Sequence, residues 1–249
     1  MTLDFAAGNY RYIPAGFQFS SGVAAHADFE IERVRFDKLV PLADGFSLIA
    51  DYILGAGRPL TALCACELRS PAAVDSDGFR AFNQHYVKTL VEWGIYDGTS
   101  DNNPVARSNV CPEIDPPTEP SFYAFSFTRP MLGARPSCVI SGGGEVRGGP
   151  GSFVERLVRY RDLSPEGWQE KVNFTVRSIT QRLEALGFAW SDTTGTQVYT
   201  VHDFHALVVD ELVRQGAAHA GLNWHFARPP VLDMEFEIDT RRVMREFVI

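Results

Sequence analysis

The sequence predicts an α+β protein built from two diverged copies of one small domain, the first spanning residues 1–130 and the second residues 131–249. Strand-like and helix-like segments follow the order ββ-α-β-α-ββ in the first copy, and this order returns after about half the chain. In both copies a Ser-Gly pair ends an early strand and a glycine ends the first helix. We expect each copy to form a mostly antiparallel sheet with two helices on one face and a neighbour covering the other.

The first copy contains two segments with helical periodicity. Phe46, Ile49 and Ile53 recur at the spacing of one helix face after Pro41, and glycines end this segment at positions 55 and 57. A second amphipathic segment runs through residues 76–93 and stops at a glycine. Apolar runs of strand length lie between turn residues; they cover residues 17–22, 31–36, 60–68, 105–111 and 121–128.

The second copy repeats these elements beyond a turn at residues 129–135. Ser164 is a typical N-cap residue and Pro165 suits the first helical position, so a long helix is expected from there to Gly187. A shorter helix is expected over residues 203–215. The expected strands cover residues 138–142, 194–201, 222–227 and 231–240.

Composition and charge exclude several classes of protein. The 249 residues are 45% hydrophobic and carry a formal net charge of −8, which argues against nucleic acid as a partner. No stretch approaches the roughly 20 apolar residues that span a membrane, and the first residues lack the pattern of a signal peptide. We expect Cys64 and Cys66 to point to opposite faces of their strand, which fits a reduced compartment. The sequence therefore predicts a cytoplasmic protein that binds neither nucleic acid nor membrane.

Four short motifs resemble the RidA (YjgF) family. In the first copy, FRAFNQHY at residues 79–86 resembles the family's second-helix pattern, and ARSNV at residues 106–110 resembles its A-R-S-x-V strand. In the second copy, residues 183–192 resemble the exit of the family's first helix, and residues 232–238 resemble its last strand. The resemblance implies two tandem domains with a chorismate-mutase-like fold, which associate in a trimer-type assembly, so that the protein is a homo-oligomer.

The same resemblance implies a binding site. The family's arginine, which grips the carboxylate of an imino or enamino acid, maps onto Arg107. Asn83 matches the asparagine of the second helix, and Ser21 with Gly22 would line the same pocket. The family's N-terminal tyrosine is matched loosely, by Tyr10 or its neighbour at position 12.

The second copy departs from this pattern. The family's water-holding glutamate falls on Glu235, but Gly221 stands where the arginine is expected and Val208 where the asparagine is expected. In the first copy the glutamate position falls near Phe122. We therefore expect one ligand site, around Arg107, and the sequence leaves open whether Glu235 reaches it.

These residues suit the hydrolysis of a C–N bond. A planar guanidinium binds a carboxylate through two parallel hydrogen bonds and so orients the substrate. An activated imine then needs an oriented water molecule and a group that accepts a proton, without metal or cofactor. The sequence therefore predicts a cofactor-independent deaminase or imine hydrolase, and the resemblance suggests an aminomuconate-like carboxylate as its substrate.

Alternatives stay open from sequence alone. Arg107 could form a structural ion pair with Glu113 or Asp115, and Asn83 could bond to helix backbone. The chain could also be a chorismatase-like hydrolase or lyase, because those enzymes carry paired domains of this fold, or a non-catalytic ligand sensor. A fold alone does not decide among these functions.

Other chemically suggestive residues have simpler interpretations. His202 and Asp203 are expected to cap a helix rather than to bind zinc, and the cysteines are expected to be buried and inert. The glycine-rich segment at residues 142–151 lacks the order of a phosphate-binding loop. We expect it to be a surface loop near the site that acts as a lid.

Overall fold

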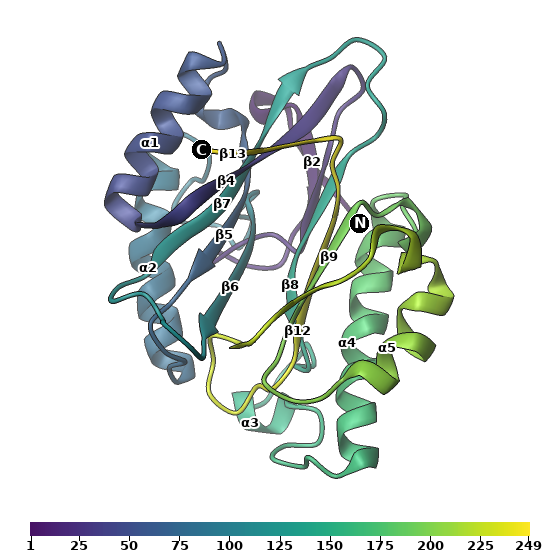
Figure 1. The fold of residues 1–249 in the computed structure, drawn as a ribbon. Helices are drawn as coiled ribbons and strands as arrows, with labels where there is room; N and C mark the ends of the chain where they lie inside the picture. The colour runs from purple at the N-terminus through teal and green to yellow at the C-terminus, as the bar shows by residue number, and fades with distance from the viewer.

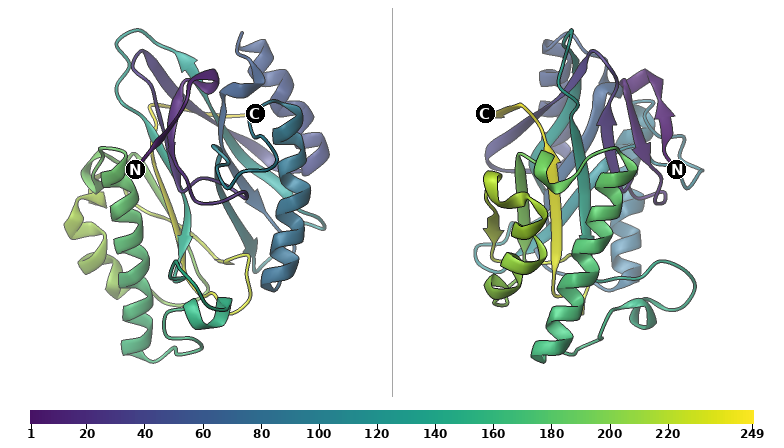
Figure 2. Two further views of the ribbon diagram at one scale, coloured as in Figure 1. Left: turned by 180° about the vertical axis from the view of Figure 1, so that it is seen from behind. Right: turned by 90° about the vertical axis from the view of Figure 1, so that its right-hand side faces the viewer.

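Two β-sheets lie face to face and carry their helices on the outer faces (Figures 1 and 2). This computed structural model describes the backbone of residues 1–249 and every side chain except those of residues 208–210. Over the described chain, one sheet has six strands and the other seven, and most neighbouring strands are antiparallel. This is the α+β architecture that the sequence predicts.

The six-stranded sheet has the order β11-β6-β5-β7-β4-β13. Helices α1 (Leu42–Gly55) and α2 (Ser76–Glu92) cover its outer face. Its strands are β4 (Phe29–Pro41), β5 (Leu63–Arg69), β6 (Ala106–Pro112), β7 (Ser121–Pro130), β11 (Ala227–Arg228) and β13 (Arg245–Val248).

The seven-stranded sheet has the order β1-β2-β3-β8-β12-β9-β10, and α4 (Pro165–Ala185) with α5 (His205–Glu211) covers its outer face. Its strands are β1 (Leu3–Phe5), β2 (Tyr10–Ile13), β3 (Gly22–Ala25), β8 (Cys138–Gly144), β9 (Gly195–Tyr199), β10 (Asn223–His225) and β12 (Glu237–Arg242). A short helix, α3 (Phe153–Arg156), follows β8, and 3-10 turns occupy Ala6–Gly8, Leu60–Ala62, Trp190–Asp192, Val213–Gln215 and Ala217–Ala220.

Both sheets take strands from both halves of the chain. The predicted boundary at residue 130 coincides with the passage from β7 to β8, but β3 pairs with β8, and β13 pairs with β4 across it. Each exchanged strand covers backbone groups of an edge that would otherwise be unpaired. The predicted strand at residues 17–22 begins only at Gly22, where this exchange starts. Strands β1, β2 and β13 were not predicted, because runs of three or four residues carry little periodicity.

Helix ends follow the chemistry of their termini. Asp75 accepts a hydrogen bond from the backbone N–H of Gly78 at 2.8 Å, and Ser164 accepts one from Gly167 at 3.2 Å, as predicted for an N-cap. Gly94 and Gly187 follow α2 and α4 with φ of 70° and 81°, in the left-handed region that favours glycine. Among the described residues, no helix is both long and apolar enough to cross a membrane.

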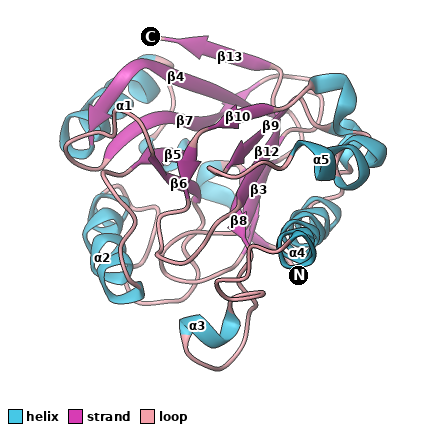
Figure 3. Ribbon diagram, turned by 60° about the horizontal axis from the view of Figure 1, so that its bottom comes forward, coloured by secondary structure: helices cyan, strands magenta, loops and turns pink.

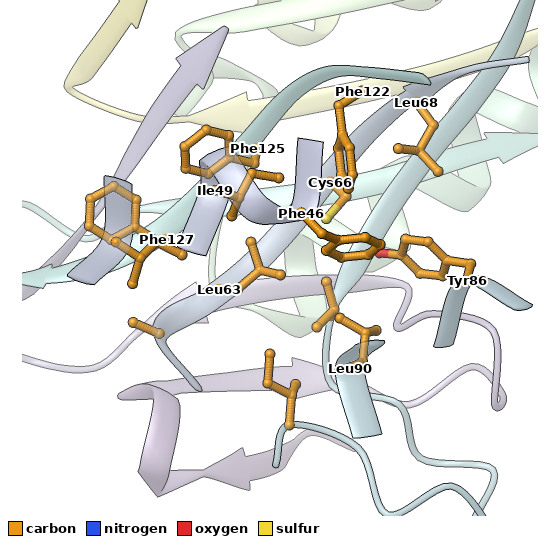
Figure 4. Packing of buried hydrophobic residues seen from close by; sticks show 14 of the residues in the cluster. Phe46, Ile49, Leu63, Cys66, Leu68, Tyr86, Leu90, Phe122, Phe125 and Phe127 are labelled. Atoms are coloured by element: carbon orange, nitrogen blue, oxygen red, sulfur yellow. The ribbon is translucent and has the colours of Figure 1, made fainter. Parts of the chain in front are cut away.

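Apolar residues fill three layers. One cluster lies between α1, α2 and the six-stranded sheet, where Phe46, Tyr86 and Phe122 pack closely (Figure 4). A second lies under α4, and a third lies between the sheets. Cys66 belongs to the first layer and Cys64 to the third, so the two thiols point to opposite faces of β5, as expected. The reason is not strand alternation, which puts residues two apart on one face, but the shift in register against β7 between Leu63 and Ala65. All four cysteines are free and buried.

Polar contacts also join the two sheets. Arg33 donates to both carboxylate oxygens of Glu67, at 2.6 and 2.8 Å. The amide of Gln197, from the opposite sheet, donates to Glu67 at 3.1 Å and to Asp239 at 2.9 Å. Because these groups are buried and hydrogen-bonded to one another, they fix the relative position of the sheets.

Candidate active site

A cavity of about 480 Å³ lies where β6 of one sheet meets β8 and β12 of the other. Figure 3 looks toward this end of the sheets, with α3 between α2 and α4. The charged residues that line it are Asp77, Arg80, Arg107, Arg156, Arg182 and Glu237. A second hollow beside α2 is larger, at about 570 Å³, but its charged residues are exposed to solvent. The cavity between the sheets is therefore the better candidate, because it alone of these two holds buried charges.

Arg107 occupies this cavity with its charge unpaired. Its backbone N–H donates to the Ser141 hydroxyl at 3.0 Å, which fixes β6 against β8. The side chain is 3% exposed, and neither Nη1 nor Nη2 has a hydrogen-bond partner within the described part of the chain. Four aromatic rings surround the guanidinium at 4.8–5.6 Å: Phe19, Phe79, Phe82 and Tyr86.

An unpaired guanidinium in such a place is poised for an anion. Burial lowers the pKa of Arg107 to about 10, so the group is still charged at neutral pH. Leaving its donors unsatisfied is costly, and a ligand carboxylate would satisfy two of them at once. The alternative of an ion pair with Glu113 is wrong, because Glu113 pairs with Arg228 at 2.9 Å.

Glu237, the first residue of β12, is the carboxylate of the cavity. It is 5% exposed, and burial raises its pKa to about 8, assisted by the negative charges of Asp239 and Glu145. Arg107 and Arg182 act in the opposite direction. A Cβ at Gly142 would overlap the Glu237 carboxylate, so the glycine leaves the space that the carboxylate occupies.

Arg182 approaches from α4 on the other face of β8. Its Nη1 donates to the carbonyl oxygens of Ser141 at 3.1 Å and Gly142 at 3.4 Å. A Cβ at Gly143 would lie 2.9 Å from that nitrogen, so this position also needs a residue without a side chain. Burial lowers the pKa of Arg182 to about 10, which leaves a positive charge beside Glu237. The first glycines of the predicted loop are therefore part of β8 and form the floor of the cavity.

The Ser-Gly pair that lines the cavity is the one in β8. The Ser141 hydroxyl donates to the Ser20 carbonyl at 2.5 Å, and the Gly142 N–H donates to the Ser108 hydroxyl at 3.1 Å. By contrast, Ser21 and Gly22 do not line the cavity: the Ser21 N–H donates to Ile13, and Gly22 pairs with Ile140 within the sheet. Both pairs are visible in the sequence, and strand pairing decides which one faces Arg107.

Three other predicted site residues lie elsewhere. Asn83 is buried in α2, and its amide donates to the Phe79 carbonyl at 2.7 Å, which is the alternative considered from sequence. Tyr10 is buried between the sheets and donates to the Leu63 carbonyl at 3.1 Å. Glu235 lies outside the lining of the cavity and contacts Nε2 of His202 at 2.7 Å. Residues 235 and 237 are two apart in a predicted strand, so periodicity places both on one face and cannot choose between them.

Strand register identifies the residues that replace this site in the second copy. Cys66 pairs with both Arg107 and Phe125, and Val198 pairs with both Trp224 and Ile238. Cys66 and Val198 both face a helical layer, so they are equivalent. Trp224, rather than the predicted Gly221, therefore occupies the place of the arginine.

The same comparison locates the glutamate's counterpart. Glu67 pairs with Ala124, and Tyr199 pairs with Glu237, so Ala124 rather than Phe122 corresponds to the glutamate. The side chain of Val208, predicted to replace the helix asparagine, is outside the described side chains. One arginine from the first half and one glutamate from the second half thus line the same cavity. The equivalent positions in the opposite halves carry Trp224 and Ala124.

Among the described residues that line this cavity there is no histidine or cysteine. His205 contacts Asp203 at 2.9 Å, and His225 contacts Gln197 at 3.2 Å. The Asp203 carboxylate also accepts a hydrogen bond from the His205 N–H, at the turn that precedes α5. Burial raises the pKa of the thiols of Cys111 and Cys138 to about 12, which makes them poor nucleophiles.

Two solved structures show weak similarity to this chain. The YjgF gene product of E. coli is 17% identical, with a TM-score of 0.32, over 44% of this chain and 81% of its own. A chorismatase is 12% identical, with a TM-score of 0.46, over 90% of this chain and 77% of its own.

Sequence similarity is much closer to one group of enzymes. Residues 2–247 match the family described as 2-aminomuconate deaminase CnbZ. The 2-amino-5-chloromuconate deaminase of Comamonas testosteroni is 49% identical over 247 residues, which are 98% of this chain and 98% of that protein. The chain therefore belongs to the CnbZ family of 2-aminomuconate deaminases.

Proposed function

We propose that this protein is a deaminase that hydrolyses the C–N bond of a carboxylate-bearing enamine or imine of the aminomuconate type. The observation that supports this most directly is that two buried groups line one cavity. Arg107 has no hydrogen-bond partner for its amino groups among the described residues, and the pKa of Glu237 is raised to about 8. Family membership points to the same reaction.

Arg107 would bind the carboxylate next to the reacting carbon. Its two free amino groups can donate parallel hydrogen bonds, which fix both the position and the plane of that carboxylate. The aromatic rings around the guanidinium exclude water and strengthen this interaction. The amino-bearing carbon is thereby held close to the Glu237 carboxyl group.

Glu237 would transfer the protons. In its neutral form it protonates the enamine carbon and produces an iminium ion, and the resulting carboxylate removes a proton from the water that attacks the iminium carbon. The carboxyl group then protonates the amino group of the carbinolamine. As the C–N bond breaks and ammonia leaves, the carboxylate takes the proton of the hydroxyl group, and the carbonyl product forms.

These steps are balanced in protons and use only the chain and one water molecule. The enamine and water yield a 2-oxo acid and ammonia, and Glu237 ends protonated, as it began. A group that must both give and accept a proton works best with a pKa near the working pH, and about 8 meets that condition.

Ammonia release from freshly generated 2-aminomuconate tests the proposal. The parent protein is expected to turn it over, and Arg107→Gln is expected to lose turnover while it stays folded by circular dichroism. A parent protein that binds the substrate without releasing ammonia would instead be a sensor, and the proposal would be wrong.

We further propose that the protein works as a cytoplasmic homo-oligomer. Strand β13 lies at the edge of the six-stranded sheet, where Phe247, Val248 and Ile249 are 44%, 57% and 45% exposed. An exposed apolar sheet edge is a surface on which another copy can pair. Light scattering coupled to gel filtration should give a mass above that of one chain, and Phe247→Glu should reduce it.

A further inference from the structure

The cavity contains a second arginine with an open donor, Arg156, which the proposed reaction does not use. We propose that Arg156 binds a second carboxylate of the substrate, so that the site selects dicarboxylates over monocarboxylates of the same chain length. This inference rests on the proposed function in one respect, namely that Arg107 holds the first carboxylate.

Arg156 is held in a defined position at the end of the short helix α3. The Ser152 hydroxyl accepts from the Glu155 N–H at 3.4 Å, and the Glu155 carboxylate accepts from the Ser152 N–H at 2.8 Å, which caps the helix reciprocally. The Arg147 N–H donates to the Arg156 carbonyl at 2.8 Å, and Val146 bridges to Leu157. These contacts join α3 to the chain that leaves β8.

The guanidinium of Arg156 is incompletely satisfied. Its Nε is buried and has no hydrogen-bond partner among the described residues. Nη1 reaches only the carbonyl of Arg147, at a long 3.4 Å. A buried donor that lacks an acceptor is costly unless a ligand supplies one, and a carboxylate does so most effectively.

The two arginines flank opposite ends of one short stretch of backbone. Arg107 is hydrogen-bonded at Ser141, and Arg156 lies beside the Val146–Leu157 bridge. Five residues of chain span at most about 18 Å, and both long side chains line the same cavity. Because both side chains line the same cavity, one substrate with an acid group at each end can contact both guanidinium groups.

Three glycines of β8 border the cavity between the two arginines. The space beside them is taken by other groups of the cavity, since a Cβ would meet the Glu237 carboxylate at Gly142, Arg182 at Gly143 and Met234 at Gly144. A substrate held by both arginines would therefore lie against Glu237, with its carboxylates pointing in opposite directions. This would place the reacting carbon near Glu237 and the far acid group near α3.

The other arginines of the cavity are less suited to this role. Arg182 already donates to two backbone carbonyls and neighbours Glu237. Arg80 is exposed on α2, over the ring of Phe17 at 5.3 Å, where solvent weakens its attraction for an anion. Arg156 is the cavity arginine other than Arg107 for which the structure shows a buried donor without a partner.

Two stable probes of the same length test this selectivity without turnover. Binding of hexa-2,4-dienedioate and of hexa-2,4-dienoate, which lacks the second carboxylate, is measured by titration calorimetry. Arg156→Gln is expected to weaken binding of the dienedioate about ten- to a hundredfold and to leave the dienoate unchanged. Arg107→Gln is expected to weaken both probes. The control Arg177→Gln removes an exposed charge of α4 and is expected to change neither.

A second variant guards against misfolding. Arg156→Lys keeps the charge and is expected to retain part of the preference for the dienedioate, although it cannot bind bidentately. Loss of both probes to the same extent in Arg156→Gln, with Arg156→Lys like the parent in fold, would overturn the inference. The inference would also be overturned if Arg156→Gln left the ratio of the two binding affinities, dienedioate to dienoate, unchanged. The same holds if Arg80→Gln, rather than Arg156→Gln, abolished the preference for the dienedioate.

The outcomes separate this inference from the proposed function. If the preference for the dienedioate depends on Arg156 but the parent protein releases no ammonia, this inference stands and the proposed function is wrong. If instead the parent protein releases ammonia from the aminomuconate, but Arg156→Gln leaves the relative affinity for the two probes unchanged, the proposed function stands and this inference is wrong.

Discussion

Strand β6 in the first copy and strand β10 in the second occupy equivalent places, but they differ in the residue that faces the helices. β6 presents Arg107, surrounded by aromatic rings and without a hydrogen-bond partner among the described residues. β10 presents Trp224, whose indole N–H donates to the Thr200 carbonyl at 2.9 Å and whose ring packs against Phe226.

The carboxylate positions differ in the same direction, since Glu237 corresponds to Ala124. The position in β6 thus keeps a charged group without a hydrogen-bond partner among the described residues, whereas the indole of Trp224 in β10 has its hydrogen-bond partner within the protein. Unsatisfied buried groups lower stability and persist where a ligand completes them. The comparison therefore supports our proposal that this duplicated fold holds one reacting site, built from both copies.

The largest effects are expected from Arg107 and Glu237. Arg107→Gln should lower kcat/KM about thirty- to several-thousandfold, because removing one partner of a buried charge pair costs about 2–5 kcal/mol. The free protein should not become less stable, since two unpartnered amino groups disappear from its interior. Steady-state kinetics and thermal unfolding measure both quantities. If Arg107→Gln retained activity, β6 would not carry the ligand-binding group and would not differ from β10 in function.

The two glutamates near the start of β12 should differ sharply. Glu237→Gln is expected to lower kcat about 10²- to 10⁴-fold with a small change in KM, because it removes the proton-transferring group. Gly142→Ala should act similarly, since a methyl group there displaces the carboxylate. Glu235→Gln is the matched control and should retain most activity. The assignment would be reversed if Glu235→Gln were the impaired variant.

The raised pKa of Glu237 predicts a pH dependence of moderate size. Burial raises this pKa from 4.5 to about 8, so the folded state binds one more proton than the unfolded state between these values. The free energy of unfolding should therefore fall as the pH rises from about 5 to about 8, by at most about 1.4 kcal/mol per pH unit. Activity that depends on the neutral carboxyl group should decline above pH 8.

Urea titrations at several pH values check this dependence. Glu237→Gln should show a weaker dependence of stability on pH in that range, because the glutamine side chain does not titrate. An identical pH dependence in parent and variant would mean that Glu237 is ionised throughout.

The smallest effect is expected from Trp224. Trp224→Ala should change kcat/KM less than about threefold, because its position carries no ligand-binding group in this copy. It should cost about 1–2 kcal/mol of stability, since the side chain is 47% exposed and loses only part of its packing. A loss of activity as large as that of Arg107→Gln would instead indicate a second working site.

Much of the fold followed from local patterns. Periodicity located α1, α2 and α4 nearly to their ends, and N-cap residues such as Ser164 marked where they begin. The family confirms the predicted deaminase class. Strands β1, β2 and β13 escaped prediction, because a run of three or four residues becomes a strand only through a partner far away in the chain.

The site was predictable only in part. Arg107 stands in a motif with a chemical reason for its residue type, and the structure finds it buried in the cavity. The sequence predicted Glu235 and the Ser21–Gly22 pair, but the cavity is lined by Glu237 and Gly142. Residue spacing does not carry the information that distinguishes these positions. Neighbouring positions on one strand face look alike until the opposite sheet is in place.

By itself the sequence determined the α+β class, the order of elements and the duplication, because each of these follows from residue type and short-range periodicity. The role that we propose for Arg107 came from the resemblance of its motif to a family. The tertiary structure alone decided which strands the two sheets exchange, which Ser-Gly pair faces the arginine, and which glutamate meets it. Those outcomes depend on contacts between residues such as Arg107 and Ser141, which lie 34 positions apart and are brought together only when the sheets pack.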